Sequence, residues 1–220
     1  MWQTIPAIWQ KYGYVYIQGA WGTVYIAVLT VAFGTLLGTL LSFMRLSRVR
    51  PLQTLVQGYV WVLRGTPTLL QIYFFYLFVP KYLPFDMNER ACIILALVVD
   101  ASAYVEEVIR AGIQAVDRGQ TEAARSLGMT ARHTMTRIIL PQAFKNILPA
   151  LGNEFIVMIK QASLASIFFI VELTSAFKTV QSATFITIPA LIISGAIYLL
   201  LTTVLSFLMK IVERRLGTSD

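Results

Sequence analysis

Two long stretches without a charged residue constrain this chain more than any other feature. They lie at residues 19–44 and 185–209, and each exceeds the roughly 20 apolar residues that a helix needs to cross a bilayer. Of the whole chain, 57% is hydrophobic and 13% charged, whereas soluble domains carry about 25% charged residues. In lipid, a helix satisfies its own backbone hydrogen bonds. The chain is therefore predicted to be an all-α integral membrane protein.

Three further apolar stretches complete the predicted spans, at residues 52–79, 91–109 and 147–171. Unlike the first two, they contain charged side chains, namely Arg64, Asp100, Glu106, Glu107, Glu154 and Lys160. Ionisable groups at membrane depth are costly and mark functional sites by default. The expected fold is thus five transmembrane helices, of which these three carry the functional information.

The basic residues outside the spans are distributed unevenly between the two sides. One side receives twelve of them, namely Arg45, Arg48, Arg50, Arg110, Arg118, Arg125, Arg132, Arg137, Lys145, Lys210, Arg214 and Arg215. The other side receives four, namely Lys11, Lys81, Arg90 and Lys178. Because cytoplasmic loops are enriched in Lys and Arg, we expect the N-terminus outside and the C-terminus inside.

The first apolar stretch is expected to remain part of the folded protein. No basic leader precedes it, it is longer than a signal-peptide core, and Trp2 and Trp9 fit a short interfacial segment ahead of it. Gly34 and Gly38 give it a small-residue face against which a second helix can pack closely. With no internal repeat and no separate soluble domain, residues 1–220 are predicted to form one membrane domain.

A polar, basic segment between the third and fourth spans is predicted to form two short helices. Asp117 or Thr121 can cap the first helix, and Gly128 can end it in a left-handed conformation. Thr130 is expected to cap a second helix that ends just before Pro141, and this proline separates it from the next span. Taken alone, such a segment is either a solvated loop or a docking surface for a cytoplasmic partner.

The residues of this segment resemble a known motif. Seven of them match the EAA loop of the membrane subunits of ATP-binding cassette importers, namely Glu122, Ala123, Ala124, Gly128, Ile138, Leu140 and Pro141. Three other segments are similar to the subfamily that imports polar amino acids, WVLRGTPTLLQIYF at 61–74, AYVEEVIRAGI at 103–113 and NEFIVMIKQASLASI at 153–167. The chain thus resembles a permease subunit with the type I importer fold.

The resemblance implies a division of labour with other chains. It implies that residues of about 114–141 form coupling helices that sit in a groove of an ATPase subunit. The chain has no GxxxxGK[ST] phosphate loop, so no cofactor is expected in it, and ATP and Mg²⁺ would be bound by the partner. The implied assembly contains two ATPase subunits, a second permease chain that is the same or related, and an extracytoplasmic solute-binding protein. It would lie among lipids in the inner, or plasma, membrane of a bacterial cell.

Other classes of partner and chemistry fit the sequence poorly. The basic residues separate apolar stretches instead of forming one stripe, so no nucleic-acid partner is expected. Cys92 is the only cysteine and His133 the only histidine, which leaves no partners for a Cys/His metal site or a histidine-dependent triad. The chain is predicted to be a non-catalytic membrane subunit.

Asp100 is the charge that most needs an explanation. It lies near the middle of its span, where an ionised Asp costs about 2.5 to 3.5 kcal/mol on insertion scales. Helical spacing places it on one face with Tyr104 and Glu107. Two explanations are open, because this face either lines a solute site or Asp100 forms a salt bridge to Arg64 or Lys160 that ties helices together.

Comparison with the resembled subfamily bears on the solute. Its members commonly show Asn-Ser-Gly-Ala-Tyr where this chain has DASAY at 100–104, so a carboxylate replaces an amide. A carboxylate attracts a cation, and we therefore predict a basic amino acid, such as arginine, lysine, histidine or ornithine, that meets Asp100 and Glu107. Glu106 is expected to project away from this face. Gln161 and Ala162 depart from the Asp or Asn followed by Thr that relatives place before Ser163.

The RGTP segment at 64–67 interrupts its span. Gly65 and Pro67 loosen the helical hydrogen bonds, and the result is either a packing kink or a set of free amides that can hold a carboxylate. The hydroxyls of two threonines would add to such a site. The full set of predicted solute-binding residues is Thr66, Thr68, Asp100, Ser102, Tyr104, Glu107 and Ser163.

Three alternatives to this function remain open. A channel or secondary transporter could use Asp100 for ions without an ATPase. A membrane enzyme could use Asp100, Tyr104 and Glu107 as an acid–base set, although no nucleophile and base occur at a recognisable spacing. An importer of another polar solute, such as glutamine or cystine, would share the same fold.

Overall fold

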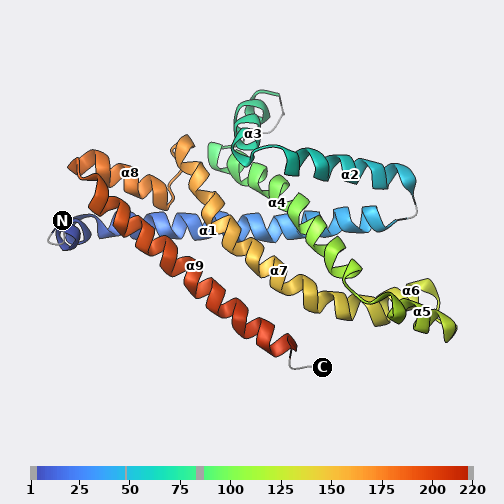
Figure 1. Cartoon of the computed structure of the whole chain (residues 1–220). Helices are drawn as coiled ribbons and strands as arrows, with labels where there is room; N and C mark the ends of the chain where they lie inside the picture. Colours follow the sequence, from blue (N-terminus) through green and yellow to red (C-terminus); the bar gives the residue numbers. More distant parts are fainter. Residues whose placement is uncertain (1–3, 48, 83–86, 218–220) are drawn as a thin grey trace.

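The computed structural model describes residues 4–47, 49–82 and 87–217, and every regular element in those ranges is a helix (Figure 1). The predicted interfacial Trp2 and the basic Arg48 lie outside the described residues. The longest helix is α1 (Thr4–Leu46), which also contains Trp9. The others are α2 (Arg50–Gly65), α3 (Thr68–Tyr82), α4 (Glu89–Gln114), α5 (Arg118–Ser126), α6 (Ala131–Thr134), the π-helical turn η1 (Met135–Ile139), α7 (Leu140–Gln161), the 3₁₀ turn η2 (Ala162–Phe168), α8 (Leu173–Thr184) and α9 (Thr187–Gly217).

Helices α1 and α4 form the most extensive helix pair of the structure. Their axes approach closely at two glycines of α1, as the small-residue face predicted. A Cβ atom on Gly34 would lie 2.9 Å from Cβ of Ala101, and one on Gly38 would lie 2.7 Å from Cβ of Val105. No side chain fits between the helices at these points, so the pair is held as one unit.

Length and composition allow two of the helices to cross a membrane singly, α1 and residues 187–215 of α9. Two bent pairs meet the same criterion when each pair is joined. The first joins α2 to α3 at 107°, and the second joins residues 131–168 to α8 at 45°. Helix α4, which contains the predicted span 91–109, does not meet it, since three acidic residues lie within that span.

The predicted span over residues 52–79 consists of two helices, α2 and α3. The chain turns between α2 and α3, and Thr66 is extended there, with φ −118° and ψ 143°. The cause is Pro67, whose ring disfavours a helical conformation of the preceding residue. The interruption foreseen at the RGTP segment is real, but it is a sharp corner and not a slight kink.

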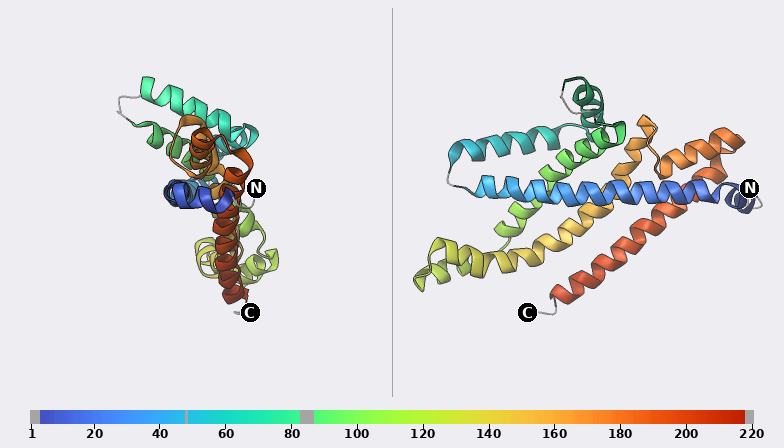
Figure 2. Two further views of the ribbon diagram at one scale, coloured as in Figure 1. Left: turned by 90° about the vertical axis from the view of Figure 1, so that its left-hand side faces the viewer. Right: turned by 180° about the vertical axis from the view of Figure 1, so that it is seen from behind.

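The predicted caps of the polar segment are confirmed. The Asp117 carboxylate accepts a hydrogen bond from the Gly119 amide at 2.7 Å, and α5 follows it. Gly128 has φ +79° after the end of this helix. The hydroxyl of Thr130 then accepts from the His133 amide at 3.3 Å. In Figures 1 and 2 the α5–α6 segment projects at one end of the molecule, beyond the ends of α4 and α7.

The expectation that Pro141 separates the second short helix from the next span is wrong. The helical path continues from α6 through η1 into α7. Pro141 has no amide hydrogen to donate, and it lies in the first turn of α7, just after the wider π turn. The π turn before it interrupts the regular α-helical hydrogen bonds, so the missing donor of Pro141 does not break the helical path.

Helix α8 was not predicted. The side chain of Glu172 caps its start by accepting from the amides of Thr174 at 2.7 Å and Ser175 at 2.5 Å. Phe169 and Phe185 flank it with left-handed conformations at φ 58° and 56°. Bulky residues rarely adopt this conformation. A glycine at either position would have marked a turn, but the sequence has phenylalanine at both, so the turns could not be predicted.

Candidate solute site and coupling segment

Asp100 lies fully buried on α4, at the corner between α2 and α3. The hydroxyl of Thr68 donates to its Oδ2 at 3.3 Å, whereas its Oδ1 has no hydrogen-bond partner in the described part of the chain. No ion pair connects Asp100 to Arg64 or Lys160 among the described residues. The explanation of Asp100 as half of a salt bridge between helices is therefore not supported by the structure.

Gln71 holds the corner in place. Its Nε2 donates to the carbonyl of Leu63 at 2.8 Å and to the carbonyl and hydroxyl of Thr66 at 3.2 and 3.0 Å. These carbonyls lie at the end of α2, where a helix leaves acceptors unsatisfied. The Thr66 hydroxyl also donates to Val62 at 2.9 Å. Of the two predicted threonines, only Thr68 contacts Asp100.

Glu154 of α7 is a second buried carboxylate at this site, and it was not among the predicted solute-binding residues. Its Oε1 has no hydrogen-bond partner in the described residues, and it interacts electrostatically with Asp100 and Tyr104. The signal in the sequence was an acid inside a predicted span. Periodicity along one helix could not reveal that it faces Asp100 on another.

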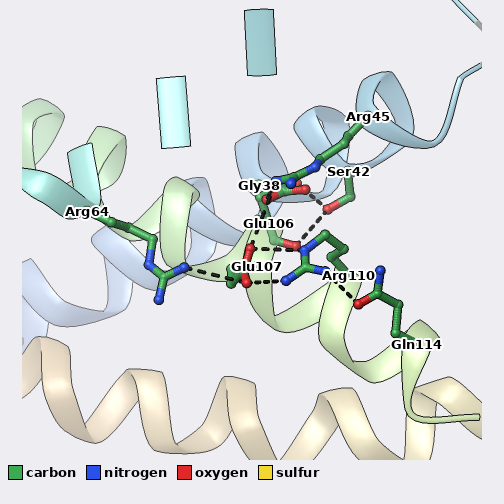
Figure 3. A network of polar contacts seen from close by, with 8 residues as sticks. All are labelled: Gly38, Ser42, Arg45, Arg64, Glu106, Glu107, Arg110 and Gln114. Atoms are coloured by element: carbon green, nitrogen blue, oxygen red, sulfur yellow. Dashed lines mark hydrogen bonds and ion pairs between the residues drawn. The ribbon is translucent and has the colours of Figure 1, made fainter. Parts of the chain in front are cut away.

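Tyr104 and Glu107 share the face of Asp100 but have different surroundings. The guanidinium of Arg64 lies over the Tyr104 ring, 5.6 Å from its centre, and 3.6 Å from Oε1 of Glu107. Glu107 also pairs with Arg110 and, at 3.9 Å, with Arg45 (Figure 3). Arg110 donates hydrogen bonds to Glu107, and these bonds raise the pKa of Arg110 above its usual value, so its guanidinium stays charged. Glu107 thus already has three cationic partners.

Glu106 projects away from this face, as expected, but into a buried ion pair. Its side chain is fully buried, and its Oε2 lies 3.0 Å from Arg45 of α1. Ser102 is likewise buried and shares a hydrogen bond with the Tyr59 hydroxyl at 2.7 Å. Ser163 donates to the carbonyl of Lys160 at 2.6 Å. Neither serine forms a hydrogen bond with Asp100 in the described structure.

The EAA-like residues lie on and around the projecting segment. Glu122 and Ala123 are exposed on α5, whereas Ala124 is buried against the rest of the segment. Leu127 follows with 84% of its surface exposed. Ile138 and Leu140 are half-buried, and Pro141 is exposed at the start of α7. This short segment thus has both an exposed apolar side chain and an exposed acidic one.

The family model described as "Binding-protein-dependent transport system inner membrane component" matches residues 31–218. The chain belongs to this family. The resemblance to type I importer permeases is thereby confirmed. As a member, the chain is a multi-pass inner membrane protein and a non-catalytic subunit, because ATP hydrolysis in such importers is performed by a separate ATPase.

Named relatives and a solved structure agree with this assignment. The arginine transport system permease protein ArtQ of Bacillus subtilis (strain 168) is 37% identical, over 93% of both chains. The nopaline transport system permease protein NocM of Agrobacterium fabrum is 38% identical, over 87% of this chain and 83% of its own. A crystal structure of an amino acid ABC transporter with histidines superposes with a TM-score of 0.89 at 42% identity, over 93% of this chain and 95% of that chain.

Proposed function

We propose that this chain is the transmembrane subunit of an ATP-driven importer of basic amino acids. The observation that carries the proposal is the pair of buried carboxylates, Asp100 and Glu154, which each leave an oxygen without a hydrogen-bond partner in the described residues. Buried charges are stable only when they are paired. A cationic solute would supply the missing charge.

The unpaired oxygens around the site favour a solute with many N–H donors. Besides Asp100 and Glu154, the buried side-chain oxygen of Gln71 at the α2–α3 corner has no described partner. All three groups are acceptors, and leaving a buried acceptor unmet costs about 1 to 3 kcal/mol. A guanidinium offers five N–H donors and an ammonium three, whereas the uncharged amide of glutamine offers two. The site therefore suits arginine-like solutes better than glutamine or cystine.

The α2–α3 corner is the proposed place for the carboxylate of the solute. Helix α3 begins there, at Thr68. The first amides of a helix have no intrahelical acceptor and attract anions. Pro67 supplies no amide hydrogen, so the amides of Thr68 and Leu69 are the ones available. Recognition would then need one cationic end near Asp100 and one anionic end near this corner.

The proposed topology has five spans, with the N-terminus outside. Helix α1 is the first span and α9 the fifth. Along the chain between them, the joined α2–α3 unit is one broken span, α4 is a span with charged residues, and residues 140–168 form the fourth span. The start of α1 and the α5–α6 segment lie at opposite ends of the molecule (Figures 1 and 2). The excess of basic residues on the side of α5–α6 supports placing that end in the cytoplasm.

The projecting segment is proposed to seat in a separate ATPase, which binds ATP and Mg²⁺. Its exposed Leu127 and Glu122 support a contact of this kind. Two ATPase subunits, a second permease chain and an extracytoplasmic binding protein would complete the importer. Closure of the ATPase pair would move the segment and shift the permease between two orientations.

Uptake into proteoliposomes that contain the chain with its ATPase tests this proposal. ATP-dependent uptake of arginine or lysine should exceed that of glutamine, and Asp100→Asn should reduce this preference by about tenfold, equivalent to one lost charge-assisted hydrogen bond. Glu213→Gln, which makes the same carboxylate-to-amide change at an exposed position of α9, is the matched control. Solute flux without ATP would instead favour a channel or secondary transporter, and an unchanged preference in Asp100→Asn would refute the basic solute.

A further inference from the structure

Five charged residues gather at the inner end of α4, outside the proposed solute site. We call them the arginine cluster, and its members are Arg45, Arg64, Glu106, Glu107 and Arg110. Figure 3 shows them converging from three helices, Arg45 from α1, Arg64 from α2 and the others from α4. With three arginines and two glutamates, the cluster has a net charge of +1 when all five side chains are ionised.

The two halves of the cluster are held with very different strength. On the α1 side, Arg45 lies 3.0 Å from the fully buried Glu106, beside the closely packed Gly38. On the α2 side, Arg64 lies 3.6 Å from Glu107, and 43% of its side chain is exposed. The Arg64–Glu107 contact is thus longer and more exposed to solvent than the Arg45–Glu106 contact. An exposed ion pair of this kind contributes little to stability, so it can open without unfolding the helices.

Arg64 also contacts the wall of the solute site. Its guanidinium lies over the ring of Tyr104, which interacts electrostatically with Arg64, Asp100 and Glu154. On its other side, Glu107 binds Arg110, and Arg110 donates to Gln114 at 2.5 Å. Gln114 is the last residue of α4, after which the chain leads into α5. Arg64 therefore lies between the acidic site and the helix that leads to the projecting segment.

We propose that Arg64 is a positioning residue that communicates the charge state of the solute site to the coupling segment. This inference rests on the proposed function. Without a solute, Arg64 lies over the Tyr104 ring and also 3.6 Å from Glu107. A cationic solute bound at Asp100 would repel Arg64 from the Tyr104 ring and strengthen its contact with Glu107. Solute binding would then tighten the link between the end of α2 and the inner end of α4, and so favour one position of α5.

The test uses the assembled complex of this chain with its ATPase and compares three variants. Arg64→Gln removes the charge, Arg64→Lys keeps it, and Arg90→Gln removes an arginine at the other end of α4 that has no partner among the described residues. In Arg64→Gln, the stimulation of ATP hydrolysis by arginine should fall by about fivefold or more, the lower end of allosteric coupling. Basal hydrolysis and the affinity for radiolabelled arginine should stay within about twofold of wild type, as for a surface substitution.

The two other variants show whether charge at position 64 is the cause. Arg64→Lys should retain most of the stimulation, and Arg90→Gln should retain all of it. Full stimulation in Arg64→Gln would overturn the proposal. So would a drop in arginine affinity of about tenfold in that variant, equivalent to one lost charge-assisted bond to the solute, because Arg64 would then be a solute ligand.

Stability measurements separate a communicating role from a purely structural one. A melting temperature lower by more than about 4 °C in Arg64→Gln, the effect of losing about 1 kcal/mol or more, together with lost basal hydrolysis, would show that the cluster only stabilises the fold. If the wild-type complex itself showed no stimulation by any basic amino acid, the proposed function would fail, and this inference with it. A normal wild type with a fully stimulated Arg64→Gln variant would refute this inference alone.

Discussion

At the scale of single residues, the most consequential feature is which buried charges have partners. Glu106 and Glu107 form ion pairs with arginines, whereas Asp100 and Glu154 have no cationic partner among the described residues. Both Asp100 and Glu107 were predicted to bind the solute, because helical spacing places them on one face of α4. Only the neighbouring helices distinguish Asp100, which has no cationic partner among the described residues, from Glu107, which has three.

Close packing at Gly38 gives a residue-scale prediction. A Cβ atom there would lie 2.7 Å from Val105 and 2.8 Å from the backbone oxygen of Ser102. Gly38→Ala should therefore lower the free energy of unfolding by about 1 to 3 kcal/mol, the usual cost of overpacking. Thermal unfolding in detergent would measure this loss.

Gly58 provides the matched control within α2. A Cβ atom at this position would meet nothing within 4 Å, and alanine favours a helix over glycine by about 0.5 to 1 kcal/mol. Gly58→Ala should thus be neutral or slightly stabilising. Equal losses in both variants would mean that the α1–α4 contact is not the tight one described.

At the scale of elements, local signals placed the caps correctly and missed the bends. Asp117, Gly128 and Thr130 act through their immediate neighbours, so their roles were predictable from sequence. The 107° corner at Thr66 depends in addition on Gln71, whose amide reaches back five to eight residues. The path through Pro141 depends on a π turn for which the sequence has no clear marker.

The left-handed Gly128 gives a prediction at this scale. Its φ of +79° is strained for a β-branched residue, whereas asparagine tolerates such angles. Gly128→Val should cost about 1 to 2 kcal/mol locally and misplace the end of α5, so that ATP-driven uptake is lost while the membrane helices stay folded. Gly128→Asn should keep most of the uptake.

Uptake and folding would be measured on the same preparations, by transport assay and by circular dichroism. If Gly128→Val transported like the parent chain, the turn after α5 would have no role in coupling. A variant that failed to enter the membrane at all would contradict the view that this segment folds independently of the spans.

At the scale of the whole molecule, the apolar surface sets the environment. Leu199 and Phe207 of α9 have 67% and 64% of their surface exposed. Many large apolar residues of α1 and α3 are exposed as well. Exposed apolar area of this extent marks contact with a membrane or another chain. This exposed surface fits a protein whose apolar side chains are covered by lipid and by partner chains.

The proposed topology gives a prediction at this scale. In a Cys92→Ala background, Ser182→Cys on α8 and Thr121→Cys on α5 each place one thiol at an exposed position. A membrane-impermeant maleimide applied to intact spheroplasts should label Ser182→Cys and not Thr121→Cys. After the cells are opened, both should be labelled. The reverse pattern would invert the proposed orientation.

The sequence by itself determined the membrane environment, the helical class, the caps of the projecting segment and the family, because composition, periodicity and short motifs act locally. It also singled out Asp100, since a charge in an apolar span is visible in one dimension. Tertiary structure decided the corner at Thr66, helix α8, the partners of Glu107 and the electrostatic interaction between Asp100 and Glu154. These features depend on which faces of separate helices meet. The electrostatic and packing forces there act between residues that are far apart in the chain, and local sequence patterns do not show which of them come together.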